Sequence, residues 1–166
     1  MIYLDNAATS FPKPERVYQR IDEVLRTIGG NPGRSSHTMA IEAARVVFGA
    51  REAVSSLIGC MDSSRVAFTK NATEAINIAI KGLLKPGDHV ITSAFEHNSI
   101  VKSLARLEAA GVEVTKVSPD SEGFLRPSDI EAAMRKNTKM VCLSHASNVF
   151  GAIQSLPDIG RVCRSR

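Results

Sequence analysis

The chain has 166 residues, of which 43% are hydrophobic and 23% charged, so it is long enough to form one domain with a substantial core. The net charge of +4 comes from scattered Lys and Arg residues and aromatic residues make up only 5%, which gives no support for nucleic-acid binding. No stretch is long enough to predict a membrane span, and the N-terminus lacks the pattern of a signal peptide. We therefore expect a cytoplasmic protein with neither a nucleic acid nor a membrane as partner.

The cysteines also favour a reducing compartment such as the cytoplasm. Cys60, Cys142 and Cys163 are odd in number and contain no Cys-x-x-Cys pair, which argues against a disulfide framework and against a zinc ribbon. Cys142 lies inside an apolar run, so we expect an inert core residue there. The sequence predicts no metal site.

Helical and strand patterns alternate along the chain. Helices are predicted at residues 15–28, 39–58, 98–110 and 128–136, with another that begins near Thr73 and another that begins at Leu156. Strands are predicted at residues 66–69, 89–92, 112–117 and 139–143. This alternation predicts an α/β fold in three layers, with a mostly parallel sheet covered by helices on both faces. Because the last helix does not return to the sheet, we expect the fold to be incomplete at the C-terminus.

One strand–turn–helix unit organises the middle of the chain. An apolar run at residues 66–69 precedes a polar turn and the helix that begins near Thr73. The first turn of a helix presents unpaired N–H groups and the positive end of the helix dipole, and both favour a phosphate. Asn71 and Thr73 are also good capping residues, so an ordinary capped helix remains the alternative at this point.

Polar residues gather where three of the predicted strands end, at residues 69–73, 93–98 and 144–148. Ligands of parallel sheets bind at the carboxyl ends of the strands, where these residues are expected. Pyridoxal 5′-phosphate (PLP) needs a helix N-terminus for its phosphate, a flat group against its ring and a donor to its phenolic oxygen. His97 can supply the flat group and transfer protons, and the amide of Asn148 can donate. Considered alone, His97 could equally be a histidine that caps a helix, and Asn148 could be an ordinary turn residue.

Five blocks of sequence in one order make the pattern more specific. They are residues 5–9, 31–37, 68–74, 96–99 and 144–149. In order and spacing these blocks resemble those of class V aminotransferases, particularly the cysteine desulfurases and selenocysteine lyases. The resemblance extends over nearly the whole chain.

The resemblance implies roles for two sets of residues. The cofactor-binding set is Ala72 and Thr73 for the phosphate, His97 for the pyridine ring and for proton transfer, and Asn148 for the phenolic oxygen. The substrate-binding set is Asn6, Ala7, Arg34 and His37, although Arg34 and His37 could instead brace a loop. It also implies that residues 1–14 contribute to a small domain and that residues 15–166 form part of a large PLP-binding domain.

The function implied by the resemblance is PLP-dependent conversion of L-cysteine to L-alanine, with the sulfur transferred to an enzyme cysteine beyond Arg166. A homodimer and a sulfur-acceptor protein are the implied partners. The lysine that holds PLP, the acid for the pyridine nitrogen and the arginine for the substrate are all expected beyond Arg166. We therefore expect residues 1–166 alone to be inactive.

Two groups of alternatives remain open. Another class V enzyme, such as an aminotransferase, an epimerase or a kynureninase-like protein, would use the same front portion. If the chain ends at Arg166, a non-catalytic α/β module that binds a phosphorylated ligand is the second alternative.

Overall fold

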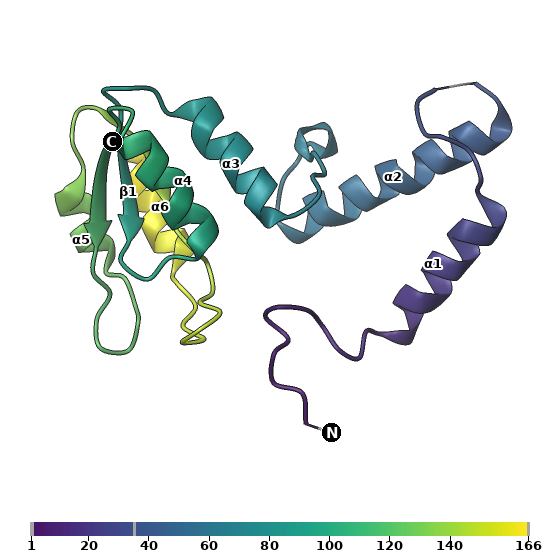
Figure 1. Ribbon diagram of the computed structural model, residues 1–166, viewed down its shortest axis with the longest axis horizontal. Helices are drawn as coiled ribbons and strands as arrows, with labels where there is room; N and C mark the ends of the chain where they lie inside the picture. Colours follow the sequence, from purple (N-terminus) through teal and green to yellow (C-terminus); the bar gives the residue numbers. More distant parts are fainter. Residues whose placement is uncertain (1, 35, 166) are drawn as a thin grey trace. The chain divides into compact units, whose positions relative to one another are not determined.

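The computed structural model describes residues 2–34 and 36–165 (Figure 1). The chain divides into two compact units, Met1–Phe68 and Thr69–Arg166. The first unit is helical, and the second contains all the strands of the described residues. The assignment of residues 1–14 to a small domain and of residues 15–166 to a large one stays a prediction.

Two helices dominate the first unit, α1 (Glu15–Thr27) and α2 (Thr38–Leu57), and a short 3-10 helix, η1 (Ser63–Arg65), follows them. Apolar residues of α1 recur at helical spacing, and Gly29-Gly30 follows the end of the helix. The side chain of His37 caps the N-terminus of α2. Both helices agree with the sequence prediction to within one residue.

The second unit is built on a parallel sheet of three strands in the order β2-β1-β3. The strands are β1 (His89–Ser93), β2 (Glu113–Val117) and β3 (Thr138–Cys142). Four helices belong to the same unit: α3 (Ala72–Leu83), α4 (Asn98–Glu108), α5 (Pro127–Ala133) and α6 (Leu156–Arg164). These elements confirm the predicted helices and the last three of the four predicted strands.

The central strand β1 directs the packing on both faces of the sheet. Its neighbouring residues Val90 and Ile91 are fully buried, and successive side chains of a strand point to opposite faces. Each therefore belongs to a different apolar cluster. One cluster joins the sheet to α3 and α4 and comprises Ile80, Leu84, Val90, Ile100, Leu104 and Val112. The other joins it to α5 and α6 and comprises Ile91, Val117, Leu125, Ile130 and Ile159. The three-layer α/β fold is confirmed (Figure 1).

The strand order separates two loops at the carboxyl ends of the strands. The chain passes from β1 to β2 on one side of β1 and then returns to β3 on the other side. As a result, the loop after β1 leads to α4 on one face, whereas the loop after β3 leads to α6 on the opposite face. Ligands of open α/β sheets bind where neighbouring loops diverge in this way.

The strand predicted at residues 66–69 is wrong. These residues contain no strand, and Phe68 is 54% exposed. An apolar run forms a strand only where a neighbouring strand pairs with its backbone groups, and no described strand pairs with this one. The strand-turn-helix unit is therefore a loop followed by α3.

Ile130 tests the packing of the α5/α6 face. Its side chain is fully buried in the second cluster. Substitution of Ile130 by Ala leaves a cavity beneath α5, and we expect the free energy of unfolding to fall by about 2–5 kcal/mol in urea denaturation. Ile78→Ala is the control, because Ile78 is 61% exposed. An equal loss in the two variants would contradict this packing.

A buried histidine at the start of β1 links this strand to both of its neighbours. His89 is fully buried, and its Nδ1 and Nε2 lie 2.8 Å from the hydroxyl oxygens of Thr138 and Thr115 respectively. Arg135 donates to both hydroxyl oxygens and pairs with Glu113. Burial, with a smaller contribution from the charge of Arg135, lowers the pKa of His89 below its usual 6.5. The folded state therefore favours the neutral imidazole.

This preference makes stability dependent on pH. Below pH 6.5 the unfolded chain binds a proton that the folded chain does not, so stability falls as the pH is lowered from 6.5 toward the folded-state pKa of His89. We expect His89→Gln to reduce this dependence in urea denaturation, and His145→Gln, at an exposed position, to preserve it. An undiminished pH dependence in His89→Gln would assign the effect to other groups.

Candidate functional site

The first turn of α3 retains unpaired hydrogen-bond donors. The Asn71 side chain accepts from the Glu74 N–H (2.9 Å), and the Glu74 carboxylate accepts from the Lys70 N–H (2.8 Å). This reciprocal capping begins the helix in the way that the sequence predicts. Within the described part of the chain, the N–H groups of Ala72 and Thr73 and the Thr73 hydroxyl have no hydrogen-bond partner. These three donors are at the positive end of the α3 dipole.

His97 caps α4 and is also held in a defined orientation. Its Nδ1 accepts from the Ser99 N–H (3.1 Å) and lies 2.8 Å from the Ser99 hydroxyl oxygen. Because Nδ1 accepts an N–H, the proton of the neutral ring is assigned to Nε2. The side chain is exposed, and Nε2 has no partner among the described residues. Capping therefore leaves one nitrogen and the faces of the ring available.

Thr73 and His97 line the same cavity, which has a volume of ≈ 520 Å³. Asn77 and residues of α4 complete it, among them Lys102 and Arg106. These two cations are four residues apart, one helical turn, and both belong to the same row of α4 as Asn98. The residues that line the cavity thus include Thr73, with its unpaired N–H group and hydroxyl, an imidazole and two positive charges. Such a set of groups suits an anion beside a ring.

The sequence identified Thr73 and His97 but not the two cations. The signal that could have found Lys102 and Arg106 is their spacing of four and eight residues from Asn98 on a predicted helix. From the sequence, Glu96 was a residue that could orient its neighbours. In the structure its carboxylate lies between the loops that follow β1 and β3, where it accepts hydrogen bonds from Ser144.

Asn148 lies in a turn within the excursion between β3 and α6. The strand-like pair Ala146 and Ile153 closes this excursion, and the Gly151 N–H donates to the Ser147 carbonyl (3.0 Å). Asn148 is exposed, its amide has no partner in the described part of the chain, and it is not among the residues that line the Thr73–His97 cavity. Its contact with a phenolic oxygen stays a prediction.

The four residues predicted to bind substrate lie in the first unit. The Asn6 amide is used within its own loop, where Oδ1 accepts from the Phe11 N–H (3.1 Å). Ala7 lies in the adjacent turn. His37 caps α2 through Nδ1, which accepts from the Ala40 N–H (3.3 Å). The exposed Arg34 has no described partner; Ser35 of the same block lies outside the described residues. Their roles toward a substrate stay predictions.

The groups around α3 and α4 fit PLP on chemical grounds. The N–H groups of Ala72 and Thr73 and the Thr73 hydroxyl match the acceptor oxygens of a phosphate. The oriented imidazole of His97 offers a flat surface for an aromatic ring. This match concerns the phosphate and the ring only.

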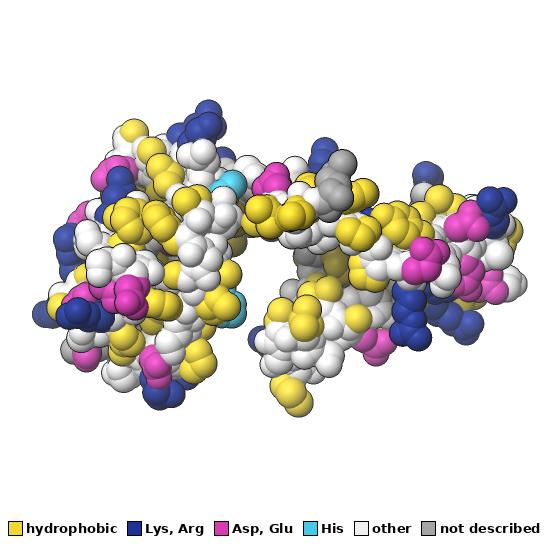
Figure 2. Space-filling view, turned by 90° about the horizontal axis from the view of Figure 1, so that it is seen from below, with side chains coloured by type: hydrophobic (Ala, Val, Ile, Leu, Met, Phe, Trp, Pro, Cys, Tyr) yellow, Lys and Arg dark blue, Asp and Glu magenta, His cyan; other side chains and the backbone are white. Residues whose placement is uncertain are grey.

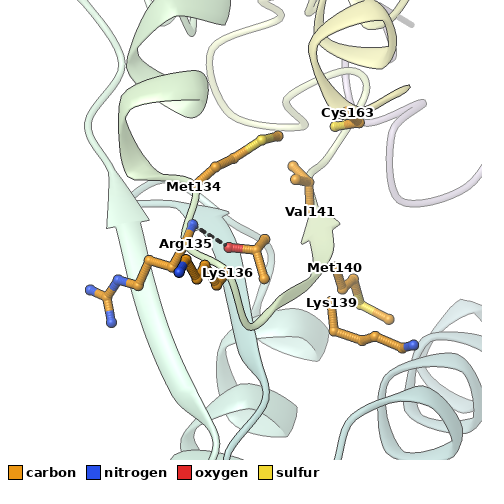
Figure 3. Close-up of a pocket in the computed structure, with 8 residues that line it drawn as sticks. Met134, Arg135, Lys136, Lys139, Met140, Val141 and Cys163 are labelled. Carbon is orange, nitrogen blue, oxygen red and sulfur yellow. Dashed lines mark hydrogen bonds between the residues drawn. The ribbon is translucent and has the colours of Figure 1, made fainter. Parts of the chain in front are cut away.

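Another cavity (≈ 470 Å³) lies beside the edge strand β3, between the end of α5 and Cys163 of α6 (Figure 3). Met134, Val141 and Cys163 supply its apolar part, and the Arg135 N–H donates to the Thr138 hydroxyl within its lining (2.7 Å). Figure 3 shows the Arg135 side chain extending away from Cys163. Its lining also includes Lys136 and Lys139 but, unlike that of the cavity at α3, no histidine and no residue from the first turn of a helix.

The remaining chemistry of the described residues is limited. They contain no group of three or more His, Cys, Asp or Glu side chains that could hold a metal ion. None of their helices is both long and apolar enough to cross a membrane. Burial raises the pKa of the Cys142 thiol to about 11, with a smaller contribution from the charge of Glu96. The thiol therefore stays protonated near neutral pH, in agreement with the inert role predicted for it.

The fold defines an α/β protein with a parallel sheet and with a cavity lined by residues of α3 and α4. Residues 2–166 match the family Aminotransferase class-V, and the chain belongs to this family.

Its relatives include cysteine desulfurases. Cysteine desulfurase IscS of Pectobacterium carotovorum subsp. carotovorum (strain PC1) is 39% identical over 171 residues, which cover 99% of this chain and 42% of the relative. Cysteine desulfurase IscS of Vibrio vulnificus (strain YJ016) is 40% identical with the same coverage. The chain thus spans less than half the length of the curated relatives that it matches.

Solved structures show the same fold. The apo structure of cysteine desulfurase from Thermococcus onnurineus NA1 superposes with a TM-score of 0.89 at 32% identity, covering 99% of this chain and 41% of that one. The structure described as SspA in complex with cysteine gives a TM-score of 0.88 at 31% identity, with 99% and 48% coverage. The predicted resemblance to class V aminotransferases of the cysteine desulfurase type is confirmed.

Proposed function

We propose that this chain is the PLP-binding front portion of a cysteine desulfurase. The proposed reaction converts L-cysteine to L-alanine and transfers the sulfur to an enzyme cysteine outside residues 1–166. The observation that carries the proposal is the shared cavity of Thr73 and His97, whose lining brings a residue with an unpaired helix N–H group together with an oriented imidazole. Relatives described as cysteine desulfurases, at 39–40% identity, support the choice of reaction.

The phosphate is assigned to the first turn of α3. The N–H groups of Ala72 and Thr73 donate to its oxygens, and the Thr73 hydroxyl adds a third hydrogen bond. Lys102 and Arg106 raise the positive potential of the cavity. The Asn71–Glu74 cap keeps this turn formed before a ligand arrives, so that little ordering remains to be done on binding.

His97 and Asn148 are assigned to the ring of the cofactor. The imidazole lies against the pyridine ring, while Ser99 holds Nδ1 and leaves Nε2 to accept or deliver a proton. The Asn148 amide donates to the phenolic oxygen. PLP, when bound, supplies the electron sink for the reaction.

The substrate side is assigned to residues of the first unit. Asn6 and Ala7 lie near the amino acid, and Arg34 and His37 lie at the mouth of the site. The lysine, the acid and the arginine that complete the chemistry belong to sequence outside residues 1–166. Residues 1–166 alone are therefore expected to bind ligand without turnover.

The thiols suit a reducing environment. Cys60, Cys142 and Cys163 are all free. Free thiols persist in the cytoplasm, whereas secreted proteins tend to form disulfides. We assign the protein to the cytoplasm, with a sulfur-acceptor protein as a second partner.

The phosphate assignment predicts a selective loss of affinity. We expect Thr73→Val to weaken binding of pyridoxamine 5′-phosphate about tenfold, since one hydrogen bond to a charged group is lost. Affinity for pyridoxamine, which lacks the phosphate, should not change. Ligand fluorescence measures both, and neither ligand carries an aldehyde that could react with surface lysines.

The control for this comparison is Thr27→Val, at an exposed position of α1. Equal affinities of Thr73→Val and wild type for pyridoxamine 5′-phosphate would contradict the phosphate assignment. Failure of the wild-type chain to bind pyridoxamine 5′-phosphate, with tight binding of another phosphorylated ligand, would favour a non-catalytic phosphate-ligand module.

A homodimer is proposed from the first unit. α1 contains no buried residue, and its apolar side chains Val17, Ile21 and Leu25 are all exposed. A cavity of ≈ 640 Å³ along α2 is lined mainly by apolar residues, including Ile41 and Phe48. Figure 2 shows hydrophobic side chains on the surface of both units. Exposed apolar surface of this kind is typical of protein interfaces.

We expect Phe48→Glu to shift the chain toward the monomer, because a carboxylate on the apolar face of α2 would be buried without a partner in the dimer. Sedimentation velocity over a range of protein concentrations measures the shift. Met61→Glu, at a fully exposed position outside this cavity, is the control and should leave the oligomeric state unchanged. A wild-type chain that stays monomeric at every concentration would contradict the proposal.

A further inference from the structure

The loop that carries His97 and the loop that carries Asn148 are joined by one carboxylate. We propose that Glu96 is a positioning residue, which fastens these two loops together where β1 and β3 end and so holds His97 in place for the cofactor. The link to the cofactor rests on the proposed function, whereas the fastening itself rests only on the geometry of the second unit.

The Glu96 carboxylate accepts hydrogen bonds from both loops. Oε1 accepts from the Ser93 hydroxyl (2.7 Å), on the side of β1. Oε2 accepts from the Ser144 hydroxyl (2.6 Å), on the side of β3. The Ser144 N–H is shared between the two oxygens, at 3.1 and 3.0 Å. Three donors from two loops thus converge on one side chain.

This contact begins where the backbone pairing of the two strands ends. The last paired residues of β1 and β3 are Thr92 and Cys142, and the Thr92 hydroxyl donates to the Cys142 carbonyl (2.9 Å). Beyond this point the Ala94 N–H donates to Val117 of β2 (2.9 Å), so the chain stays attached to the strand on the other side. On the side of β3, where backbone pairing with β1 has ended, the hydrogen bonds of the Glu96 carboxylate connect the two segments instead.

The position matters because the two loops diverge here. One leads to α4 and the other to α6, on opposite faces of the sheet. The rings of Phe95 and Phe150 provide a second contact between the loops, with centroids 5.1 Å apart, but both rings are more than half exposed. Ser93 is buried, so the hydrogen bonds of Glu96 anchor the loops to the sheet itself. Glu96 directly precedes His97, and fixing one restrains the other.

A carboxylate is better suited to this task than an amide. The three groups that point at Glu96 are all donors, and an ionised carboxylate has only acceptors. No ion pair of Glu96 occurs among the described residues, so its charge is balanced by the O–H and N–H dipoles alone. Glutamine would place an NH₂ group against one of these donors. Because glutamine has nearly the same shape as glutamate, the effect of Glu96→Gln reports the contribution of the negative charge and of its acceptor oxygen.

Hydrogen exchange of the full chain tests the fastening without any ligand. We expect Glu96→Gln to speed exchange of the Ser144 amide about tenfold and to speed exchange of residues 145–150, because the charged acceptor is lost. Glu108→Gln is the matched control, since Glu108 is exposed on α4 and its carboxylate has no hydrogen bond or ion pair in the described part of the chain. Ser144→Ala keeps the N–H and removes one donor, and should give a smaller effect that is not additive with Glu96→Gln.

Bound pyridoxamine 5′-phosphate tests the consequence for the site. We expect Glu96→Gln to bind it about tenfold more weakly, since a loosened loop must be ordered on binding, and to reduce the circular dichroism of the bound ligand. Glu108→Gln should change neither. A merely structural role elsewhere in the fold would leave the dichroism at saturation unchanged.

The outcomes are distinct. Unchanged exchange of Ser144 in Glu96→Gln would overturn the proposal, and so would faster exchange with unaltered ligand affinity and dichroism. If the wild-type chain binds no pyridoxamine 5′-phosphate, the proposed function fails, and the exchange of Ser144 alone decides whether Glu96 fastens the loops.

Discussion

The structure depends on the complete burial of β1. All five of its residues are buried, so the strand must be covered on both faces and paired on both edges. The alternation of Val90 and Ile91 assigns α3 and α4 to one face and α5 and α6 to the other. Reversal of the strand order around β1 then separates the loops that follow β1 and β3. The divergence of these loops is a consequence of core packing. The Thr73–His97 cavity is likewise lined by residues of helices that pack on one face of the sheet.

Sequence patterns predicted the local features of this arrangement well. The helices that became α1, α2 and α4 and the strands β1 and β3 were predicted because apolar spacing and Gly or Asn boundaries are local signals. The strand at residues 66–69 failed because strand formation depends on a partner that no local pattern specifies. An apolar run indicates that a segment tends to be buried. Whether it pairs as a strand depends on a partner strand elsewhere in the chain.

The contacts that assemble the site are beyond such patterns. Glu96 and Ser144 are 48 residues apart in sequence, and Thr73 and His97 share a cavity only because α3 and α4 pack on the same face of the sheet. Predicting either contact requires the strand order β2-β1-β3, which no local feature encodes. The resemblance to a family supplied these residues, Glu96 and Ser144 included, but it did not indicate that the two make contact.

The candidate site residues differ in whether their hydrogen-bonding groups are already used within the fold. Asn6 and His37 satisfy backbone groups of their own loop or helix, so the fold itself uses these side chains. Ala72, Thr73 and Nε2 of His97 have hydrogen-bonding capacity that the described residues do not use. At α3 the cap is Asn71, which leaves Ala72 and Thr73 unpaired, whereas His97 caps α4 through Nδ1 and keeps only Nε2 unpaired. A ligand gains most where donors are already oriented and still unpaired, and in this chain that condition is met at the start of α3 beside His97.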